Sequence, residues 1–194
     1  MQSVNSLCFF IGENMNDGKR FEQMFKKSVP DYCLLERLKD PPQAQNHTIN
    51  STFSWKNKCD FFMFDSKNRE FWCLELKSTK QKYISFEDIY SDKIQNKMIH
   101  KHQILGLLEY SNYDNVNSGF LFNFRDEKND TERTYYQSIK DFKLMYTKIG
   151  KFSFTEIELL LNNAIKVDGR KLKVNYVWDI NKLIEDVVNR NENK

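Results

Sequence analysis

The feature that most constrains this chain is a pair of aromatic-rich apolar runs, residues 59–64 and 71–77. They read CDFFMF and FWCLELK, and a polar segment with turn-forming residues separates them. Aromatic residues favour strands, and two such runs on either side of a short turn are typical of a β-hairpin. We therefore expect an antiparallel hairpin whose second strand is buried.

The length of the turn sets which residues face each other across the hairpin. If residues 66–69 form the loop, Asp65 faces Glu70, and the same register places Asp60 opposite Glu75. Directly opposed residues have Cβ atoms about 4.5–5.5 Å apart, and two like charges at that distance are destabilising unless something offsets them. Two carboxylates in apolar strands therefore need a positively charged partner.

Lys77 supplies one positive charge, because alternation along the strand places it on the same face as Glu75. A divalent cation would supply more, since Mg²⁺ prefers one or two protein carboxylates together with water and phosphate oxygens. Asp60, Glu75 and Lys77 thus form the layout of a metal-dependent phosphodiesterase. The alternative is an exposed hairpin edge on which Glu75 and Lys77 are solvated.

The acid-x-Lys pattern is not specific by itself. It recurs in this chain at Asp17–Lys19, Asp65–Lys67, Asp126–Lys128, Asp141–Lys143 and Glu192–Lys194. Glu75–Lys77 differs from these because it closes an apolar strand whose hairpin partner carries an acid in register. The argument for a site therefore rests on the strand context and not on the three-residue pattern.

Composition indicates one globular domain. The chain has 194 residues, of which 40% are hydrophobic and 14% aromatic, and its net charge of +3 permits nucleic-acid binding without demonstrating it. The four cysteines show no zinc-binding spacing, which favours free thiols in a reducing compartment. The apolar run 7–11 is too short for a signal peptide or a membrane span, so we expect a cytoplasmic protein without membrane contact.

The remaining periodicities predict helices and strands in an order that favours an α/β fold around a mixed sheet. A short strand is expected between the first helix and the hairpin. The other expected helices and strands are helices at residues 18–29, 91–111, 155–164 and 179–189, and strands at 119–124 and 134–139.

This order of residues and elements resembles the PD-(D/E)XK nuclease superfamily. Within it the chain is most similar to the RecU-type Holliday-junction resolvases of Gram-positive bacteria and their phages. The resemblance covers about residues 18–142, and it rests on a set of residues in the family's order: Glu22 in the first helix, Asp60, Glu75-Leu76-Lys77, His102-Gln103 in a helix, and the aromatic strand 119–122. One difference is that residues 39–58 are short where RecU proteins carry a long stalk that engages the junction centre.

The resemblance implies a fold and a role for each matching residue. It implies a single nuclease domain, 1–194, with a restriction-endonuclease-like mixed sheet flanked by helices and a C-terminal helical extension at about 151–190. Asp60 and Glu75 would bind Mg²⁺ or Mn²⁺, Glu22 would assist that metal site, and Lys77 would be the catalytic lysine. Gln103 would be the helix glutamine near the active site.

Several lysines are candidates for a DNA groove next to this site. Lys80 and Lys82 follow the second strand of the hairpin directly, and Lys97 and Lys101 lie in the helix predicted after it. A solvated helix face explains Lys93, Lys97 and Lys101 equally well.

The activity expected from these residues is a metal-dependent DNA endonuclease that resolves four-way junctions by paired cuts. A junction has two-fold symmetry, so a homodimer is expected to act on it. Two alternatives remain open from the sequence: a restriction- or repair-type endonuclease that acts on other DNA, and a non-catalytic DNA-binding module of the same fold.

Overall fold

A six-stranded mixed β-sheet is the centre of the molecule. The computed structural model describes residues 16–39, 57–93 and 95–192. The strand order is β1-β2-β3-β5-β6-β8, and the strands are β1 (Cys33–Arg37), β2 (Phe61–Asp65), β3 (Glu70–Thr79), β5 (Val116–Asp126), β6 (Thr131–Ser138) and β8 (Ile165–Val167). Neighbouring strands are antiparallel except for β3 and β5, which run parallel.

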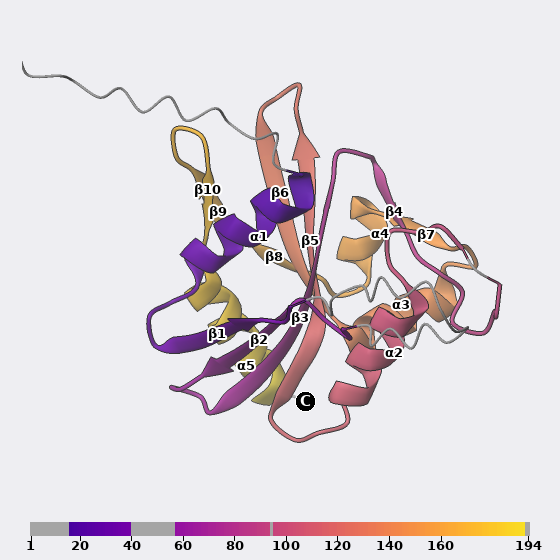
Figure 1. The fold of residues 1–194 in the computed structure, drawn as a ribbon, viewed down its shortest axis with the longest axis horizontal. Coiled ribbons are helices and arrows are strands. Elements are labelled where there is room, and N and C mark those ends of the chain that lie inside the picture. The colour runs from indigo at the N-terminus through magenta and orange to yellow at the C-terminus, as the bar shows by residue number, and fades with distance from the viewer. Residues whose placement is uncertain (1–15, 40–56, 94, 193–194) are drawn as a thin grey trace, which may run out of the picture.

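Helices cover both faces of this sheet, as Figure 1 shows. One face packs against α1 (Asp17–Ser28) and α5 (Ile180–Glu192), and the other against α2 (Lys101–Tyr110), α3 (Ile139–Lys148) and α4 (Glu156–Leu161). Residues of β3 alternate between the two cores: Trp72, Leu74 and Leu76 face α1 and α5, whereas Cys73 faces α2. The predicted α/β fold with a restriction-endonuclease-like mixed sheet flanked by helices is confirmed.

The predicted hairpin has the predicted register. Asp65 pairs with Glu70 and Phe61 with Leu74, and the turn between the strands comprises residues 66–69. Asp60 lies one residue before β2, and its amide donates at 3.0 Å to the carbonyl of Leu74, the residue that pairs with Phe61. Hairpin geometry is local, and for that reason turn length was enough to predict it.

The helix expected at 91–111 is wrong in its first half, because α2 begins only at Lys101. The preceding residues run along the segment 85–87: the Ile99 amide donates to the Ser85 carbonyl at 3.0 Å, and the Glu87 amide donates to the Ile99 carbonyl at 2.9 Å. These long-range hydrogen bonds use the backbone groups that a helix would need. Lys97 therefore does not lie on a helix.

The two predicted strands 119–124 and 134–139 correspond to the longer β5 and β6, and Ile139 belongs to the next helix instead. That helix, α3, was not predicted. Ser138 is its N-cap and accepts from the Asp141 amide at 3.1 Å, which is a standard helix-start signal. Ser138 directly ends an aromatic strand with no loop between strand and helix, so the strand pattern in the sequence did not indicate that a helix begins there.

The C-terminal part contains the two predicted helices, at α4 and α5, together with strands that the periodicity did not indicate. β8 pairs with β6 and completes the main sheet. Two small two-stranded sheets complete the described structure: β9 (Gly169–Lys171) with β10 (Tyr176–Trp178), and β4 (Tyr83–Ser85) with β7 (Ser153–Thr155). The C-terminal residues are thus part of the sheet and of the core around α5.

Two further expectations from the sequence concern the cysteines and membrane-spanning helices. Cys33, Cys59 and Cys73 are free thiols, and the last two are buried. None of the helices in the described part of the chain combines the length and the apolar character that crossing a membrane requires. Residues 39–58, the segment compared above with the RecU stalk, lie almost entirely outside the described residues.

Candidate active site

The candidate site lies where β3 crosses the middle of the sheet. Leu74 and Leu76 point into the core under α1 and α5, so Glu75 and Lys77 point to the other face, toward α2. Glu75 is only 2% exposed. A carboxylate buried this deeply must be paired or protonated.

Glu75 has two side-chain donors on one oxygen. Lys77 Nζ lies 2.8 Å from Glu75 Oε1, and Gln103 Nε2 of α2 donates to the same atom. Gln103 is itself fixed, because its Oε1 accepts from the His100 amide at 2.9 Å in the capping box of α2. The first turn of α2 therefore fixes the position of Gln103, which donates a hydrogen bond to Glu75.

Asp60 is anchored by the backbone of both neighbouring strands. Its Oδ2 accepts from the Leu76 amide at 2.8 Å, and its carbonyl accepts from the Leu38 amide, also at 2.8 Å. Asp60 lies close enough to Glu75 to raise the pKa of that glutamate. The sequence prediction that Asp60 and Glu75 meet across the hairpin agrees with this geometry.

Burial disfavours the charged form of both carboxylates, and the charge of Asp60 also disfavours that of Glu75. Burial raises the pKa of Glu75 to about 8, Lys77 opposes that shift, and the charge of Asp60 adds to it. Burial likewise raises the pKa of Asp60, against the Leu76 amide and Lys77, which lower it. Without a further cation the pair therefore retains a proton well above the usual range of carboxyl groups.

A glycine allows α2 to approach this pair closely. A Cβ at Gly106 would lie 2.4 Å from Cβ of Lys58, two residues before Asp60. Gly106 is buried within α2, and any larger residue there would push the helix away from the strand that carries Asp60. The spacing between Gln103 and the carboxylates depends on this contact.

Glu22, the first-helix acid that was expected to assist the metal site, forms an ion pair with Arg37. Its Oε2 accepts from Arg37 Nε at 2.6 Å, so α1 is tied to the end of β1. The charge of Glu22 still raises the pKa of Asp60, and that of Arg37 lowers it, which places both within electrostatic range of the site. The structure thus brings Asp60, Glu75, Lys77 and Gln103 together, with the Glu22–Arg37 ion pair beside them.

The donor set fits a hard, hydrated cation. Mg²⁺ and Mn²⁺ accept oxygen ligands and keep several waters, so two carboxylates are enough protein ligands for them. The raised pKa values of Asp60 and Glu75 supply a driving force, because a divalent cation would stabilise the ionised pair. Among the described residues, no three His, Cys, Asp or Glu side chains are grouped closely enough to hold a metal ion by themselves. Asp60 and Glu75 are the residues that would hold one.

The comparison with curated proteins gives one informative match. The chain is 34% identical over 198 residues to the SPbeta prophage-derived uncharacterized protein YotM of Bacillus subtilis (strain 168), and the match covers 95% of this chain and 92% of that protein. The chain belongs to the YotM family. No model of a protein family matches it.

The four lysines predicted to bind DNA differ in their ion pairs and exposure in this member of the YotM family. Lys80 Nζ lies 3.1 Å from Asp17 and 2.6 Å from Glu127, and Lys101 Nζ lies 3.3 Å from Asp92. Lys82 is exposed and Lys97 is half-buried. Two of the four predicted lysines are therefore already paired with carboxylates.

Sequence reasoning missed two contributors to the site of this YotM-family chain. Arg37 ends an edge strand, and only the fold brings it to Glu22. Gly106 matters through its contact with Lys58, and a single glycine in a helical pattern was the only sequence signal for it. Both act through tertiary contacts that periodicity does not encode.

Proposed function

We propose that this YotM-family protein is a Mg²⁺- or Mn²⁺-dependent DNA endonuclease. The observation that carries the proposal is the proximity of the buried Glu75 to the half-buried Asp60, with Lys77 and Gln103 bonded to the same oxygen of Glu75. A glutamate with a purely structural role would need one positively charged side chain as a partner, and a neighbouring acid would destabilise its charged form. Two neighbouring carboxylates become favourable when they bind a divalent cation that also binds a phosphate group.

Each residue has a definite task in that proposal. Asp60 and Glu75 would hold the metal ion, which would activate a water molecule and neutralise charge on the scissile phosphate. Lys77 would orient that water or stabilise the charge that develops on the phosphate oxygens. Gln103 keeps Glu75 in one orientation, and Arg37 keeps Glu22 beside the site without adding it to the carboxylate pair.

We propose the four-way junction as the substrate to test first. The support is the resemblance to RecU-type resolvases in the order of Glu22, Asp60, Glu75-Leu76-Lys77 and Gln103, together with the prophage origin in the name of the relative. A two-fold symmetric junction needs two symmetric cuts, so a homodimer is part of the proposal. A restriction- or repair-type endonuclease would share the site and differ in its preferred DNA.

The deciding experiment compares a synthetic four-way junction with a matched duplex, each incubated with Mg²⁺, Mn²⁺ or EDTA. Paired cuts on opposing strands of the junction, lost in EDTA and lost in Asp60→Asn, would support a resolvase. Equal cutting of the duplex with unpaired nicks would support a general endonuclease. DNA binding without metal-dependent cutting of either substrate would contradict nuclease activity and favour a non-catalytic binding module.

A further inference from the structure

A hollow of about 590 Å³ lies between α1 and β1. Its lining residues are Lys26, Leu35, Glu36, Arg37 and Lys39. We name this hollow the α1–β1 groove. It was not part of the sequence prediction, because its cations come from two separate segments of the chain, α1 and the end of β1, and converge only when α1 packs on the edge strand.

The two lysines of the groove are available for a ligand. Lys26 and Lys39 are exposed, and within the described residues neither forms an ion pair. Lys80 and Lys101, which sequence reasoning had assigned to DNA, are paired with Asp17, Glu127 and Asp92. A lysine already held by a carboxylate gains less from a phosphate than an unpaired one does.

The groove lies next to the segment that carries Asp60 of the candidate active site. Lys26 Nζ lies 5.5 Å from the ring centroid of Phe61, the residue after Asp60. Lys39 follows Leu38, whose amide donates to the Asp60 carbonyl at 2.8 Å. Phe61 points into the core under α1, whereas Glu75 faces α2, so the groove lies on the α1 side of the segment that carries Asp60.

Arg37 lies between the two regions. It lines the groove and at the same time bonds Glu22, and its charge acts on Asp60. A guanidinium is planar and offers several donors, which suits a phosphate group. Glu36 is the carboxylate among the residues that line the groove, so cations outnumber acids there.

We propose that the α1–β1 groove binds the phosphate backbone of the DNA strand that enters the active site. This rests on the proposed function, and it goes further by assigning the non-specific affinity for DNA to Lys26 and Lys39 in place of Lys80 and Lys101. The bound group is the phosphodiester backbone, and the contacts carry no sequence preference.

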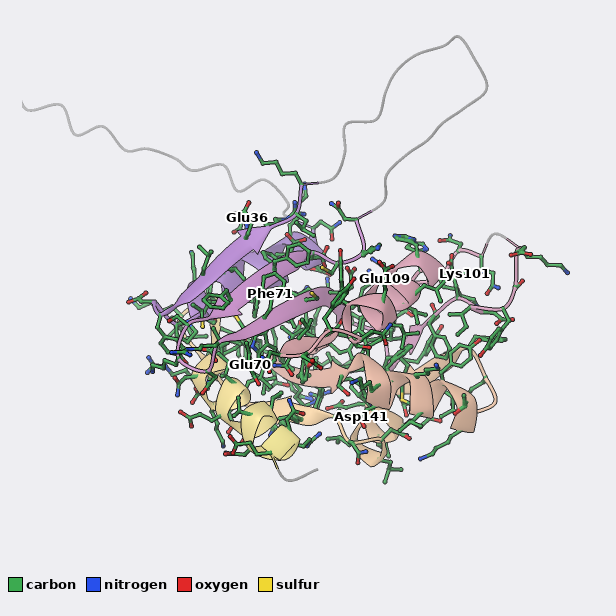
Figure 2. All side chains as sticks on the ribbon, turned by 90° about the horizontal axis from the view of Figure 1, so that it is seen from below. Glu36, Glu70, Phe71, Lys101, Glu109 and Asp141 are labelled. Carbon is green, nitrogen blue, oxygen red and sulfur yellow. The ribbon has the colours of Figure 1, made fainter. Side chains whose placement is uncertain are left out.

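The test measures DNA binding without cleavage. A labelled duplex is titrated in EDTA at several salt concentrations, with wild type, the double variant Lys26→Gln/Lys39→Gln, and the control Lys143→Gln/Lys148→Gln. The control lysines are exposed and lie on α3, and Figure 2 shows Asp141 of α3 on the opposite side of the molecule from Glu36 of β1. All three proteins carry the same fold elements, and the two variants change net charge equally.

The expected result is a flatter dependence of log affinity on log salt in the groove variant. On duplex DNA each phosphate contact contributes a slope of about −0.9, so the loss of two contacts should flatten it by about 1.8, and the control should match wild type. An unchanged slope in the groove variant would overturn the inference and leave the nuclease proposal intact. Groove-dependent binding without any metal-dependent cutting would overturn the nuclease and leave the groove. A wild type that binds no DNA at low salt would overturn both.

Discussion

The two ends of the β2–β3 hairpin carry the same arrangement of acids and use it in opposite ways. At the turn Asp65 pairs with Glu70, and at the open end Asp60 lies close enough to Glu75 to raise its pKa. Each end also carries an acid-x-Lys pattern, one at Asp65–Lys67 and one at Glu75–Lys77. The sequence pattern alone therefore does not distinguish the two ends.

At the turn, neutral donors satisfy the acids. Asp65 accepts from the Lys67 amide at 2.9 Å and from Asn68 Nδ2 at 2.6 Å, and Glu70 accepts from Asn117 Nδ2 at 2.7 Å. Lys67 turns away, and its Nζ lies 3.7 Å from the centroid of the Tyr32 ring.

At the open end the lysine bonds the acid directly, and the two carboxylates lie close together. A turn stabilised by its own backbone needs no further ligand, whereas a closely spaced acid pair retains an affinity for protons or cations. The four predictions below test this difference, from the largest expected effect to the smallest.

Substitution at the open end should abolish cleavage, and the same substitution at the turn should not. Asp60→Asn and Glu75→Gln remove a proposed metal ligand, and the loss of several kcal/mol of charge stabilisation corresponds to about a thousandfold slower cutting. Asp65→Asn and Glu70→Gln are the matched controls and should cut at the wild-type rate. Cleavage and gel shift on the same preparations measure this, and full activity in Asp60→Asn would remove that residue from the proposed site.

Lys77→Ala should slow cleavage by about a hundredfold and leave Mn²⁺ binding largely intact, because the lysine acts on water or phosphate and not on the metal. Lys67→Ala is the control from the other acid-x-Lys pattern and should change neither quantity. Calorimetric titration with Mn²⁺ separates the two effects. If Mn²⁺ binding disappears together with activity, Lys77 supports the architecture of the carboxylate pair instead.

The stability of the protein in EDTA should fall as pH rises from about 5 to 8. The pKa of Glu75 is raised to about 8 in the folded state, above its usual value of 4.5, so the folded protein binds the proton more tightly than the unfolded chain does. Between these two pKa values the unfolded chain has released the proton while the folded protein keeps it, so stability falls by up to about 1.4 kcal/mol per pH unit. Urea unfolding of wild type and Glu75→Gln measures the difference.

In that comparison Glu75→Gln should show a weaker decline, because it has no proton to lose at this position. Mg²⁺ should also weaken the decline in wild type, since it stabilises the ionised pair. Equal pH dependence in the two proteins would contradict the assignment to Glu75.

The smallest effect is expected at the turn. Asp65→Ala removes the acceptor of the Lys67 and Asn68 donors and should lower the free energy of unfolding by about 1 kcal/mol, whereas Asp65→Asn should be nearly neutral because asparagine stabilises the same kind of turn. Chemical denaturation measures both, and cleavage should be unchanged. A loss of cleavage in Asp65→Ala with the fold retained would break the distinction between the two ends.

The parts of the site that sequence reasoning found are those set by local geometry. The turn of residues 66–69 fixes the hairpin register, and with it the proximity of Asp60 to Glu75. Gln103 was identified through a family resemblance, although the helix that carries it was expected to begin ten residues too early. Its position near the helix start explains why it matters, because the capping box with His100 orients it.

The parts that sequence reasoning missed depend on distant segments. Ile99 bonds to Ser85 and Glu87 and so keeps the residues before Lys101 out of the helix. The pairing of Arg37 with Glu22 and the groove between α1 and β1 likewise require the edge strand to meet the first helix. Helical and strand periods report only on neighbours along the chain, and they contain no information about these contacts.

The parallel pairing of β3 with β5 has a consequence for the order in which the molecule assembles. A four-residue turn joins β2 to β3, whereas β3 and β5 can pair only after the whole crossover between Thr79 and Val116 has closed. Hairpins form within microseconds, and longer loops cost more chain entropy to close. The two carboxylates therefore meet while they are still in water, and α2, which lies within the crossover, buries them afterwards. We therefore expect proton uptake by this pair to accompany the later, non-local stage of folding, and the rate of that stage to depend on pH.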